Sequence, residues 1–377
     1  MDPIPALAIA SAVTTFRRGG TFTVGAEEEL LLVRDDGSLL GPAGAAVVER
    51  LSPTLDRHGT ISGELFVDEI ELGTRVCTDG AAVAECLGRL RRRLRANGAR
   101  AMAVGVHPTA EAHDAHPTHG GRYDLIGAEL AGLLRTPVAA FQVHVALPDQ
   151  ESAILAYRGL RNWLPVLRAL AASSPFWFGR DSGLAAARPA ILQSYPRVDV
   201  PPLFRSYDEY VDTVESLVAA AGVPDYTYVW WDLRPHPRYG TLEVRAMDSQ
   251  WSLARIAGLT TLVQGLARHA VEAPTGVDVP DAVLRANDFR AWRYGIDGSQ
   301  VGPDGVSRPA RELARVAVRQ ARSVLAADGL DAPLDAIDRL LREESESERQ
   351  RSLARRSGLP ALVRDLTHRT MAATPGR

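Results

Sequence analysis

The sequence predicts an α+β fold in which helices cover one face of an antiparallel β-sheet. Segments with the alternating apolar and polar pattern of strands dominate the chain before residue 249, whereas the rest has the apolar spacing of helices. Strands followed by helices are typical of α+β proteins. There is no internal repeat and no low-complexity linker. We therefore expect an N-terminal lead over residues 1–20 and a single domain over residues 21–377, whose C-terminal half, residues 249–377, is mostly helical.

The predicted strands are rich in apolar β-formers and are bounded by turn residues. The first ends at the turn Asp35-Asp36-Gly37-Ser38, a run of residues that favour turns. The last two are joined by the sequence RPHPRYG and are expected to form a hairpin. The predicted strands span residues 21–34, 64–74, 102–106, 138–147, 226–233 and 241–247.

Helices are predicted where apolar residues recur every three or four positions. Asp79 is a suitable N-cap for a helix over residues 80–97, and either Asp149 or Glu151 begins a long helix that continues to residue 170 despite Pro165. Residues 173–204 are rich in Pro, Gly and Ser and are expected to form a long functional loop. The other predicted helices span residues 207–221, 253–272, 281–292, 309–327, 333–344, 346–356 and 359–366.

The composition excludes several kinds of protein. The formal net charge of −3 gives no positive field to attract nucleic-acid phosphates. All 43 residues of the Lys+Arg count are arginine, so a Walker-type phosphate loop and a Schiff-base lysine are excluded. No apolar run approaches the length of a membrane span. Two cysteines, Cys77 and Cys86, are too few for a disulfide framework and fit a reducing compartment. We therefore expect a cytoplasmic protein with neither nucleic-acid nor membrane partners.

Pairs of ligand-type residues two positions apart recur in the predicted strands. Residues i and i+2 of a strand point to the same face of the sheet, so each pair offers two polar groups to one side. One pair could be the solvent-facing edge of an amphipathic strand, but the repetition favours the floor of a site for hard cations. The pairs are Glu27-x-Glu29, Glu69-x-Glu71, Gln142-x-His144 and Glu243-x-Arg245.

Magnesium and manganese prefer the oxygen ligands that such carboxylates supply, often together with substrate phosphates. Arg245, on the same face as Glu243, and Arg234, near the end of the neighbouring strand, could bind a phosphoryl group bidentately. Each arginine is also a candidate for a structural salt bridge. The aromatic run that ends at Trp231 has two interpretations as well, a core segment or a base-stacking surface.

Several segments together resemble the type 2 glutamate–cysteine ligase family, the bacterial carboxylate–amine ligases related to the plant glutamate–cysteine ligases. The resemblance covers nearly the whole chain and implies a catalytic domain with a funnel-shaped antiparallel sheet of the glutamine synthetase and guanidino kinase type. It also implies ATP-dependent ligation through an acyl phosphate, with Mg²⁺ as cofactor and Mn²⁺ as a substitute. The segments are GAEEEL, EIELGTRVCTD, GVHPTA, GGRYD, ALAASSPFWFGRDSG, WWDLRPHPRYGTLEVRAMD and AWRYGIDG.

The resemblance also implies roles for individual residues. Arg122 and Tyr123 would bind the acid substrate, and Thr74 is a further candidate for substrate contact. The candidates for nucleotide contact are Arg234, Trp231 and Arg245, and the two arginines would act in phosphoryl transfer. The implied metal ligands are Glu27, Glu29, Glu64, Glu71, Gln142, His144 and Glu243.

Some choices stay open at the level of sequence. Strand periodicity pairs Glu71 with Glu69, whereas the resemblance pairs it with Glu64, which requires a bend that Gly63 would permit. Many bacterial relatives have His-Val-His where this chain has Gln142-Val143-His144, so either residue could contact metal. The segment from 179 to 202, expected to close over the site, departs from the family pattern, so the amine acceptor need not be cysteine.

We therefore expect a ligase that joins a small-molecule acid, most simply the γ-carboxylate of glutamate, to cysteine or a related amine. The alternatives are a phosphotransferase like the guanidino kinases and a non-catalytic nucleotide-binding member of the family. A homo-oligomer is a reasonable expectation.

Overall fold

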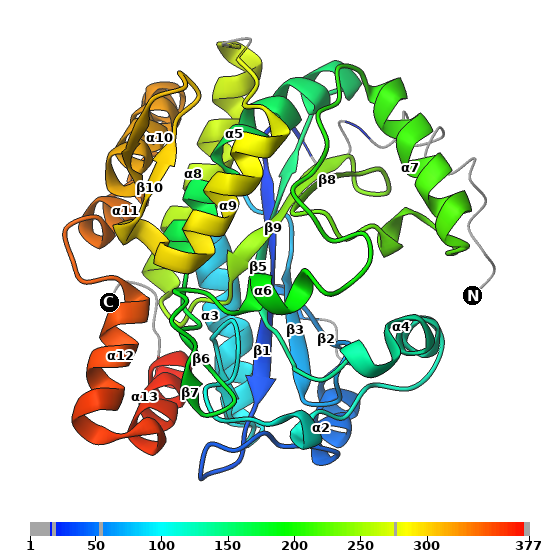
Figure 1. Cartoon of the computed structure of the whole chain (residues 1–377), viewed down its shortest axis with the longest axis vertical. Helices are drawn as coiled ribbons and strands as arrows, with labels where there is room; N and C mark the ends of the chain where they lie inside the picture. The colour runs from blue at the N-terminus through cyan, green and yellow to red at the C-terminus, as the bar shows by residue number, and fades with distance from the viewer. Residues whose placement is uncertain (1–15, 17–19, 53–55, 275–276, 373–377) are drawn as a thin grey trace.

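A computed structural model describes residue 16 and residues 20–52, 56–274 and 277–372, so most of the predicted N-terminal lead lies outside the described residues. Figure 1 shows a central sheet with a thick layer of helices against one side and shorter helices on the other. The predicted α+β fold with an antiparallel sheet is confirmed. Among the described residues, no helix is long and apolar enough to cross a membrane.

The main sheet has the strand order β2-β3-β1-β5-β9-β8, with β4 paired to β1, and every pairing within it is antiparallel. Four predicted strands appear close to their expected places, as β1, β3, β5 and β9. The strands are β1 (Val24–Leu32), β2 (Gly59–Gly63), β3 (Glu69–Thr74), β4 (Ala101–Met102), β5 (Ala140–Ala146), β8 (Leu233–His236) and β9 (Thr241–Asp248). The two small sheets are β6 (Phe176–Trp177) with β7 (Arg180–Asp181), and β10 (Ser299–Val301) with β11 (Ser307–Pro309).

Two strand predictions are wrong in position. Tyr226–Tyr228 is a short 3-10 helix capped by Asp225, whose side chain accepts a hydrogen bond from the Thr227 amide. The strand is β8, which starts at the last residue of the predicted strand and continues into the predicted turn. The prolines of RPHPRYG suggested a turn, but β8 is an edge strand, where proline is tolerated. The strand predicted over residues 102–106 contains only the two residues of β4.

The helices match their predictions most closely where the caps are strong. Asp79 and Asp149 accept hydrogen bonds from the amides of Ala82 and Ser152, so Asp149 rather than Glu151 begins the long helix. Helices α2 and α4, and α6 within the predicted loop, were not predicted. The helices are α2 (Ala43–Leu51), α3 (Gly80–Ala96), α4 (Arg122–Leu130), α5 (Gln150–Ala171), α6 (Arg188–Leu192), α7 (Tyr207–Ala221), α8 (Leu253–Glu272), α9 (Asp281–Tyr294), α10 (Ala310–Leu325), α11 (Leu334–Leu340), α12 (Glu346–Ser357) and α13 (Leu359–Ala372).

The two faces of β1 have different environments. Glu28 points to the helix side, where it is fully buried and forms an ion pair with Arg91 of α3. Nε of Arg91 donates to Glu28 at 2.8 Å, and the other guanidinium nitrogens donate to the carbonyl oxygens of Gln250 and Trp251 at 2.6 and 2.7 Å. Because side chains alternate along a strand, Glu27 and Glu29 face the opposite side of the sheet.

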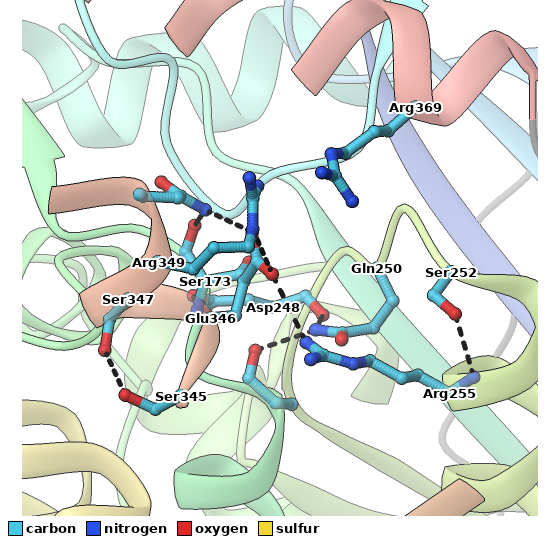
Figure 2. Close-up of polar contacts among 12 residues, drawn as sticks. Ser173, Asp248, Gln250, Ser252, Arg255, Ser345, Glu346, Ser347, Arg349 and Arg369 are labelled. Carbon is cyan, nitrogen blue, oxygen red and sulfur yellow. Dashed lines mark hydrogen bonds and ion pairs between the residues drawn. The ribbon is translucent and has the colours of Figure 1, made fainter. Parts of the chain in front are cut away.

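A second buried polar network ties the C-terminal helices to the segments beside the end of β9 (Figure 2). Glu346, at the start of α12, is 4% exposed and accepts hydrogen bonds from Arg349 at 2.6 Å and Arg255 at 3.4 Å. Gln350 donates to Glu346 and to the carbonyl oxygen of Ser173. Burial raises the pKa of Glu346, but the hydrogen bonds and charges of the two arginines outweigh it and hold that pKa below its usual value.

Candidate functional site

The register of the strands places the predicted pairs in a band across the open face of the sheet. Glu71 of β3 lies opposite Glu29 of β1, and Glu27 of β1 lies opposite Gln142 of β5. Farther along the band, His144 of β5 lies opposite Glu243 of β9. Except for His144, these residues line a cavity of about 370 Å³. The sequence prediction that these residues share one face is confirmed.

One cluster within the band has the geometry of a metal site. Ligand atoms of Glu27, His144 and Glu243 all lie within 4.8 Å of one another. Nε2 of His144 is 3.5 Å from Glu27 and 3.9 Å from Glu243 and forms no hydrogen bond, although the atom is buried. Its Nδ1 contacts the Thr241 hydroxyl at 3.0 Å, which orients the ring. In its neutral form, a buried ring nitrogen that faces two carboxylates is suited to binding a cation together with them.

The charges of this cluster shift the pKa values of its members. Burial raises the pKa of Glu243, but Arg234 and Arg245 outweigh that effect and hold it well below the usual value. Burial raises the pKa of Glu27 as well, and His144 reverses the shift, so Glu27 is also more acidic than usual. Burial lowers the pKa of His144, but Glu27 and Glu243 more than compensate and raise it. Both carboxylates are therefore held in their charged form.

The two predicted arginines differ in how fully they are engaged. Arg234 donates to Glu243 at 2.6 Å and to the carbonyl oxygens of Thr227 and Val229 at 3.2 and 2.8 Å, so its guanidinium is used within the protein. Arg245 donates through Nη1 alone, to Glu243 and Gln142, and makes no side-chain bond through Nε or Nη2 to other described residues. Arg245 therefore keeps donors for an anion in the cavity, whereas Arg234 holds Glu243 in place.

Gln142 connects the two halves of the band. Its amide nitrogen donates to Glu29 at 2.6 Å and its amide oxygen accepts from Arg245. The second oxygen of Glu29 accepts from the Ala140 amide at 2.6 Å. The register between β5 and β9 shifts between residues 141 and 143, which places Gln142 at a bulge. Both polar atoms of Gln142 are thus occupied, whereas His144 keeps a free nitrogen.

A second group of carboxylates lies at the β2–β3 end of the cavity. Burial and the nearby Glu29 raise the pKa of Glu64 to about 7. Burial and the charges of Glu27, Glu64 and Glu29 raise the pKa of Glu71 well above its usual value. Glu64 lies in the connection between β2 and β3, directly after Gly63, which is the bend that the resemblance required. Such crowding of carboxylates is relieved when cations bind between them.

Glu69, which strand periodicity offered as the partner of Glu71, also lines this end of the cavity. Its two oxygens accept hydrogen bonds from the amides of Val138 at 2.8 Å and Phe66 at 3.3 Å. Burial and the charge of Glu29 raise its pKa well above the usual value. Glu69 is therefore tied to the backbone on both oxygens and holds neighbouring segments together.

Arg122 and Tyr123 lie at the same end of the cavity, at the start of α4. The guanidinium of Arg122 lies over the ring of Tyr228, 5.2 Å from its centroid, and forms no ion pair among the described residues. The hydroxyl of Tyr123 donates to the carbonyl oxygen of Gly63 at 3.1 Å, next to Glu64. Arg122 is thus a free cation at the cavity edge, as a substrate-binding role requires.

Besides His144, the structure places two predicted residues outside the cavity lining. Trp231 is 6% exposed and packs in the main core, with its ring centroid 5.7 Å from that of Phe204; its neighbour Trp230 lines the cavity instead. Consecutive residues of an extended segment point to opposite sides, so only one of the two can face the site. The hydroxyl of Thr74 accepts a hydrogen bond from the Ala26 amide at 3.0 Å and does not line the cavity. These two placements correct the sequence predictions.

Other cavity residues were not predicted. His236 lies two positions after Arg234 in β8 and therefore on the same face, but the segment had been assigned to a turn. Burial lowers the pKa of His236 to about 3, so its ring is neutral. Arg188, at the start of α6, is buried and donates to the carbonyl oxygens of Arg245 and Met247 at 2.7 and 2.9 Å, which supports β9 from the loop side.

The chain is similar in sequence to known proteins. The chain is 35% identical over 353 residues to a provisionally named glutamate–cysteine ligase 2-1 of Rubrobacter xylanophilus, a match that covers 91% of this chain and 93% of the relative. It is 36% identical over 296 residues to a provisionally named glutamate–cysteine ligase 2 of Rhodospirillum rubrum, covering 75% of this chain and 76% of the relative.

Two solved structures share the fold. The glutamate–cysteine ligase of Francisella tularensis in complex with AMP has a TM-score of 0.71 at 13% identity, covering 93% of this chain and 88% of that one. A bifunctional glutathione synthetase from Pasteurella multocida has a TM-score of 0.67 at 14% identity, covering 97% of this chain and 53% of that one. The sequence also matches the description of glutamate-cysteine ligase family 2 over residues 23–368, and the chain therefore belongs to that family.

Proposed function

We propose that the protein is an ATP-dependent carboxylate–amine ligase that forms an amide through an acyl phosphate. The observation that carries the proposal is the cluster of Glu27, His144 and Glu243, whose ligand atoms lie within 4.8 Å of one another beside the free donors of Arg245. Carboxylates that hold divalent ions next to a guanidinium with donors to spare are what transfer of a phosphoryl group requires. The names of the relatives support ligation as the reaction.

The residues of the band fit Mg²⁺. Glu27, His144 and Glu243 would hold one ion, and Glu29, Glu64 and Glu71 a second. The unpartnered Nε2 of His144 and the crowded carboxylates support this assignment. Bound Mg²⁺ would neutralise the charge of the ATP phosphates. Carboxylate ligands suit manganese as well as magnesium, so Mn²⁺ is expected to substitute. Gln142 positions Glu29 and Arg245 and is not assigned as a ligand.

The protein residues have distinct roles in the two chemical steps. Arg245 stabilises the γ-phosphoryl group while an oxygen of the substrate carboxylate attacks it and ADP leaves. The amine then attacks the acyl carbon, the C–N bond forms, and phosphate leaves with the electron pair of the C–O bond. The proton lost by the amine passes to the departing phosphate or to a neighbouring carboxylate. Arg122, as a free cation at the cavity edge, would hold the second carboxylate of a glutamate-like acid.

A matrix of acids and amines tests the proposal. The protein is incubated with ATP and Mg²⁺, each acid with each amine, and ADP, inorganic phosphate and the product mass are measured. Ligation predicts ADP and phosphate in equal amounts, dependent on both an acid and an amine, with glutamate and cysteine as the first pair to test. ADP with a stable phosphorylated product would assign a phosphotransferase instead. Nucleotide binding without turnover for any pair would assign a non-catalytic member of the family.

A further inference from the structure

Arg197, in the loop after α6, connects three segments that border the cavity. Its Nη1 and Nη2 each donate a hydrogen bond to Glu129 of α4, and both bonds are 2.6 Å long. Its Nε donates to the carbonyl oxygen of Tyr228 at 2.9 Å, and the guanidinium lies 5.3 Å from the centroid of the Trp230 ring. Arg197 does not line the cavity itself. Its guanidinium therefore holds cavity-bordering segments to one another.

The contacts of Arg197 form a fixed joint. Its side chain is 6% exposed and that of Glu129 is 30% exposed, so solvent screens this ion pair only in part. A bidentate pair of arginine and carboxylate also fixes the relative orientation of the two groups. The backbone of Arg197 has a φ of 59°, which is unfavourable for a residue with a Cβ and persists where surrounding contacts enforce it. The Trp230 amide donates to the carbonyl oxygen of Arg197 at 3.1 Å and helps to hold that conformation.

The two partners of Arg197 also determine where Arg122 lies. Arg122 begins α4, the helix that carries Glu129. Seven residues separate the two positions, so both side chains project from the same face of the helix. The guanidinium of Arg122 lies over the ring of Tyr228, 5.2 Å from its centroid, and Arg197 binds the carbonyl oxygen of that same tyrosine. Arg197 thus ties the helix that carries Arg122 to the residue on which Arg122 rests.

Arg122 has few other constraints on its position. Among the described residues, it forms neither an ion pair nor a side-chain hydrogen bond, so its position depends on α4 and on the Tyr228 ring. Arg122 lines the cavity. A change in the joint at Arg197 would therefore move a cationic group of the cavity without touching it directly.

We propose that Arg197 is a positioning residue that sets the place of Arg122 and thereby the affinity of the site for its acid substrate. The proposal rests on the proposed ligase function, in which Arg122 holds the second carboxylate of a glutamate-like acid. Arg245 and the cluster assigned to the phosphates of ATP project from β1, β5 and β9, to none of which the Arg197 side chain bonds. The affinity for ATP should therefore depend far less on Arg197.

Steady-state kinetics of Arg197→Gln tests this role. KM and kcat are measured for glutamate with ATP, Mg²⁺ and cysteine saturating, and KM is then measured for ATP and for cysteine. We expect KM for glutamate to rise by about 10-fold or more, because a misplacement of about 1 Å can cost about 100-fold. Values of kcat and of KM for ATP should change by less than about 2-fold. An unchanged KM for glutamate, or a rise confined to ATP or cysteine, would overturn the proposal.

A double-mutant cycle separates positioning from a general weakening of the fold. If Arg197 acts through Arg122, Arg197→Gln should change KM for glutamate by less than about 2-fold in a protein that already carries Arg122→Gln. Two independent defects would multiply instead. Multiplied effects in a folded double variant would overturn the proposal.

Two further variants test the contacts of the joint. Glu129→Gln removes the charge that faces Arg197 from a partly exposed side chain, with little risk to folding, and should also raise KM for glutamate. Arg197→Lys keeps the charge, but an ammonium group lacks the planar fork that reaches both Glu129 and the Tyr228 carbonyl oxygen. It should therefore restore KM only in part. A KM for glutamate equal to that of wild type in both variants would exclude the joint as the cause.

The matched control breaks a comparable ion pair elsewhere. Arg158 donates two hydrogen bonds to Asp278, at 3.1 and 2.6 Å, and neither residue lines the cavity. Their side chains are 29% and 24% exposed. Arg158→Gln should leave KM for glutamate unchanged. A rise as large as that in Arg197→Gln would show that any lost ion pair has this effect and would overturn the proposal.

Calorimetric titration with glutamate in the presence of Mg²⁺, without ATP, measures acid binding in the absence of turnover. We expect the wild type to bind glutamate and Arg197→Gln to raise the Kd by about the factor seen in KM. Binding by a wild type that forms no product would refute the ligase function, while a raised Kd in Arg197→Gln would still support the positioning role. An unchanged Kd in Arg197→Gln, or no binding of glutamate by the wild type, would overturn that role.

Discussion

The ion pair between Glu28 and Arg91 allows a quantitative test of how β1 is held. Glu28→Gln removes the charge that balances Arg91, which is 2% exposed and keeps only backbone carbonyl oxygens as partners. Breaking a buried pair in this way costs about 3–5 kcal/mol. Unfolding entropies of about 2.1 cal/mol/K per residue give about 0.8 kcal/mol/K for this chain. The melting temperature should therefore fall by about 4–6 °C.

Thermal unfolding followed by circular dichroism measures this effect. The double variant with Arg91→Gln leaves no uncompensated charge and should be at least as stable as Glu28→Gln alone. Glu71→Gln is the matched control in the same sheet. Burial and neighbouring carboxylates raise the pKa of the Glu71 carboxyl well above its usual value, so neutralising this side chain should not destabilise the metal-free protein. A fall of less than about 1 °C for Glu28→Gln, or additive losses in the double variant, would refute the reasoning.

Three further predictions concern the site and the C-terminal network. Glu27→Ala should abolish ligation with the fold retained. Glu243→Ala would leave Arg234 and Arg245 buried without their partner, so Glu243→Gln is the better test at that position. Product assays on the folded variants measure the loss of ligation. Saturating Mg²⁺ should stabilise the protein by about 2.7 kcal/mol at 100 times its Kd, and Glu27→Ala should reduce this gain in melting experiments with and without EDTA. The pKa of Glu346 in the folded protein is below its usual value of 4.5, so the charged carboxylate stabilises the fold above that pH and loses this effect as the pH falls. The Tm difference between wild type and Glu346→Gln should therefore shrink between about pH 6 and about pH 3.5. A constant difference would exclude this role.

The sequence predicted the floor of the site because strand periodicity is local. Glu27, Glu29 and Glu71 each lie in a strand whose apolar neighbours fix which face they occupy, so their convergence followed from the pattern. Glu64 did not follow from periodicity, since it lies in a tight connection after Gly63, and only the family resemblance indicated it.

The errors arose where tertiary context decides. The strand β8 contains Pro235 and was mistaken for a turn, because sequence alone does not show that it lies at the edge of the sheet. Trp230 and Trp231 are identical in type, and only the path of the backbone determines which one faces the cavity. Likewise, the choice between Gln142 and His144 depends on hydrogen bonds to strands that are distant in the chain.

The segregation of the cavity lining has a consequence for how such enzymes can diversify. The acidic floor projects from strands that the buried core fixes in register. The apolar part of the lining, by contrast, comes mainly from Ile126 and Leu130 of α4 and from Leu192 and Val198 in and after α6. Replacing these apolar side chains would change the shape of the cavity and leave the carboxylates of the floor in place. Under the proposed function, one scaffold could thus admit different substrates through a few substitutions, while the residues assigned to the phosphoryl transfer stay the same.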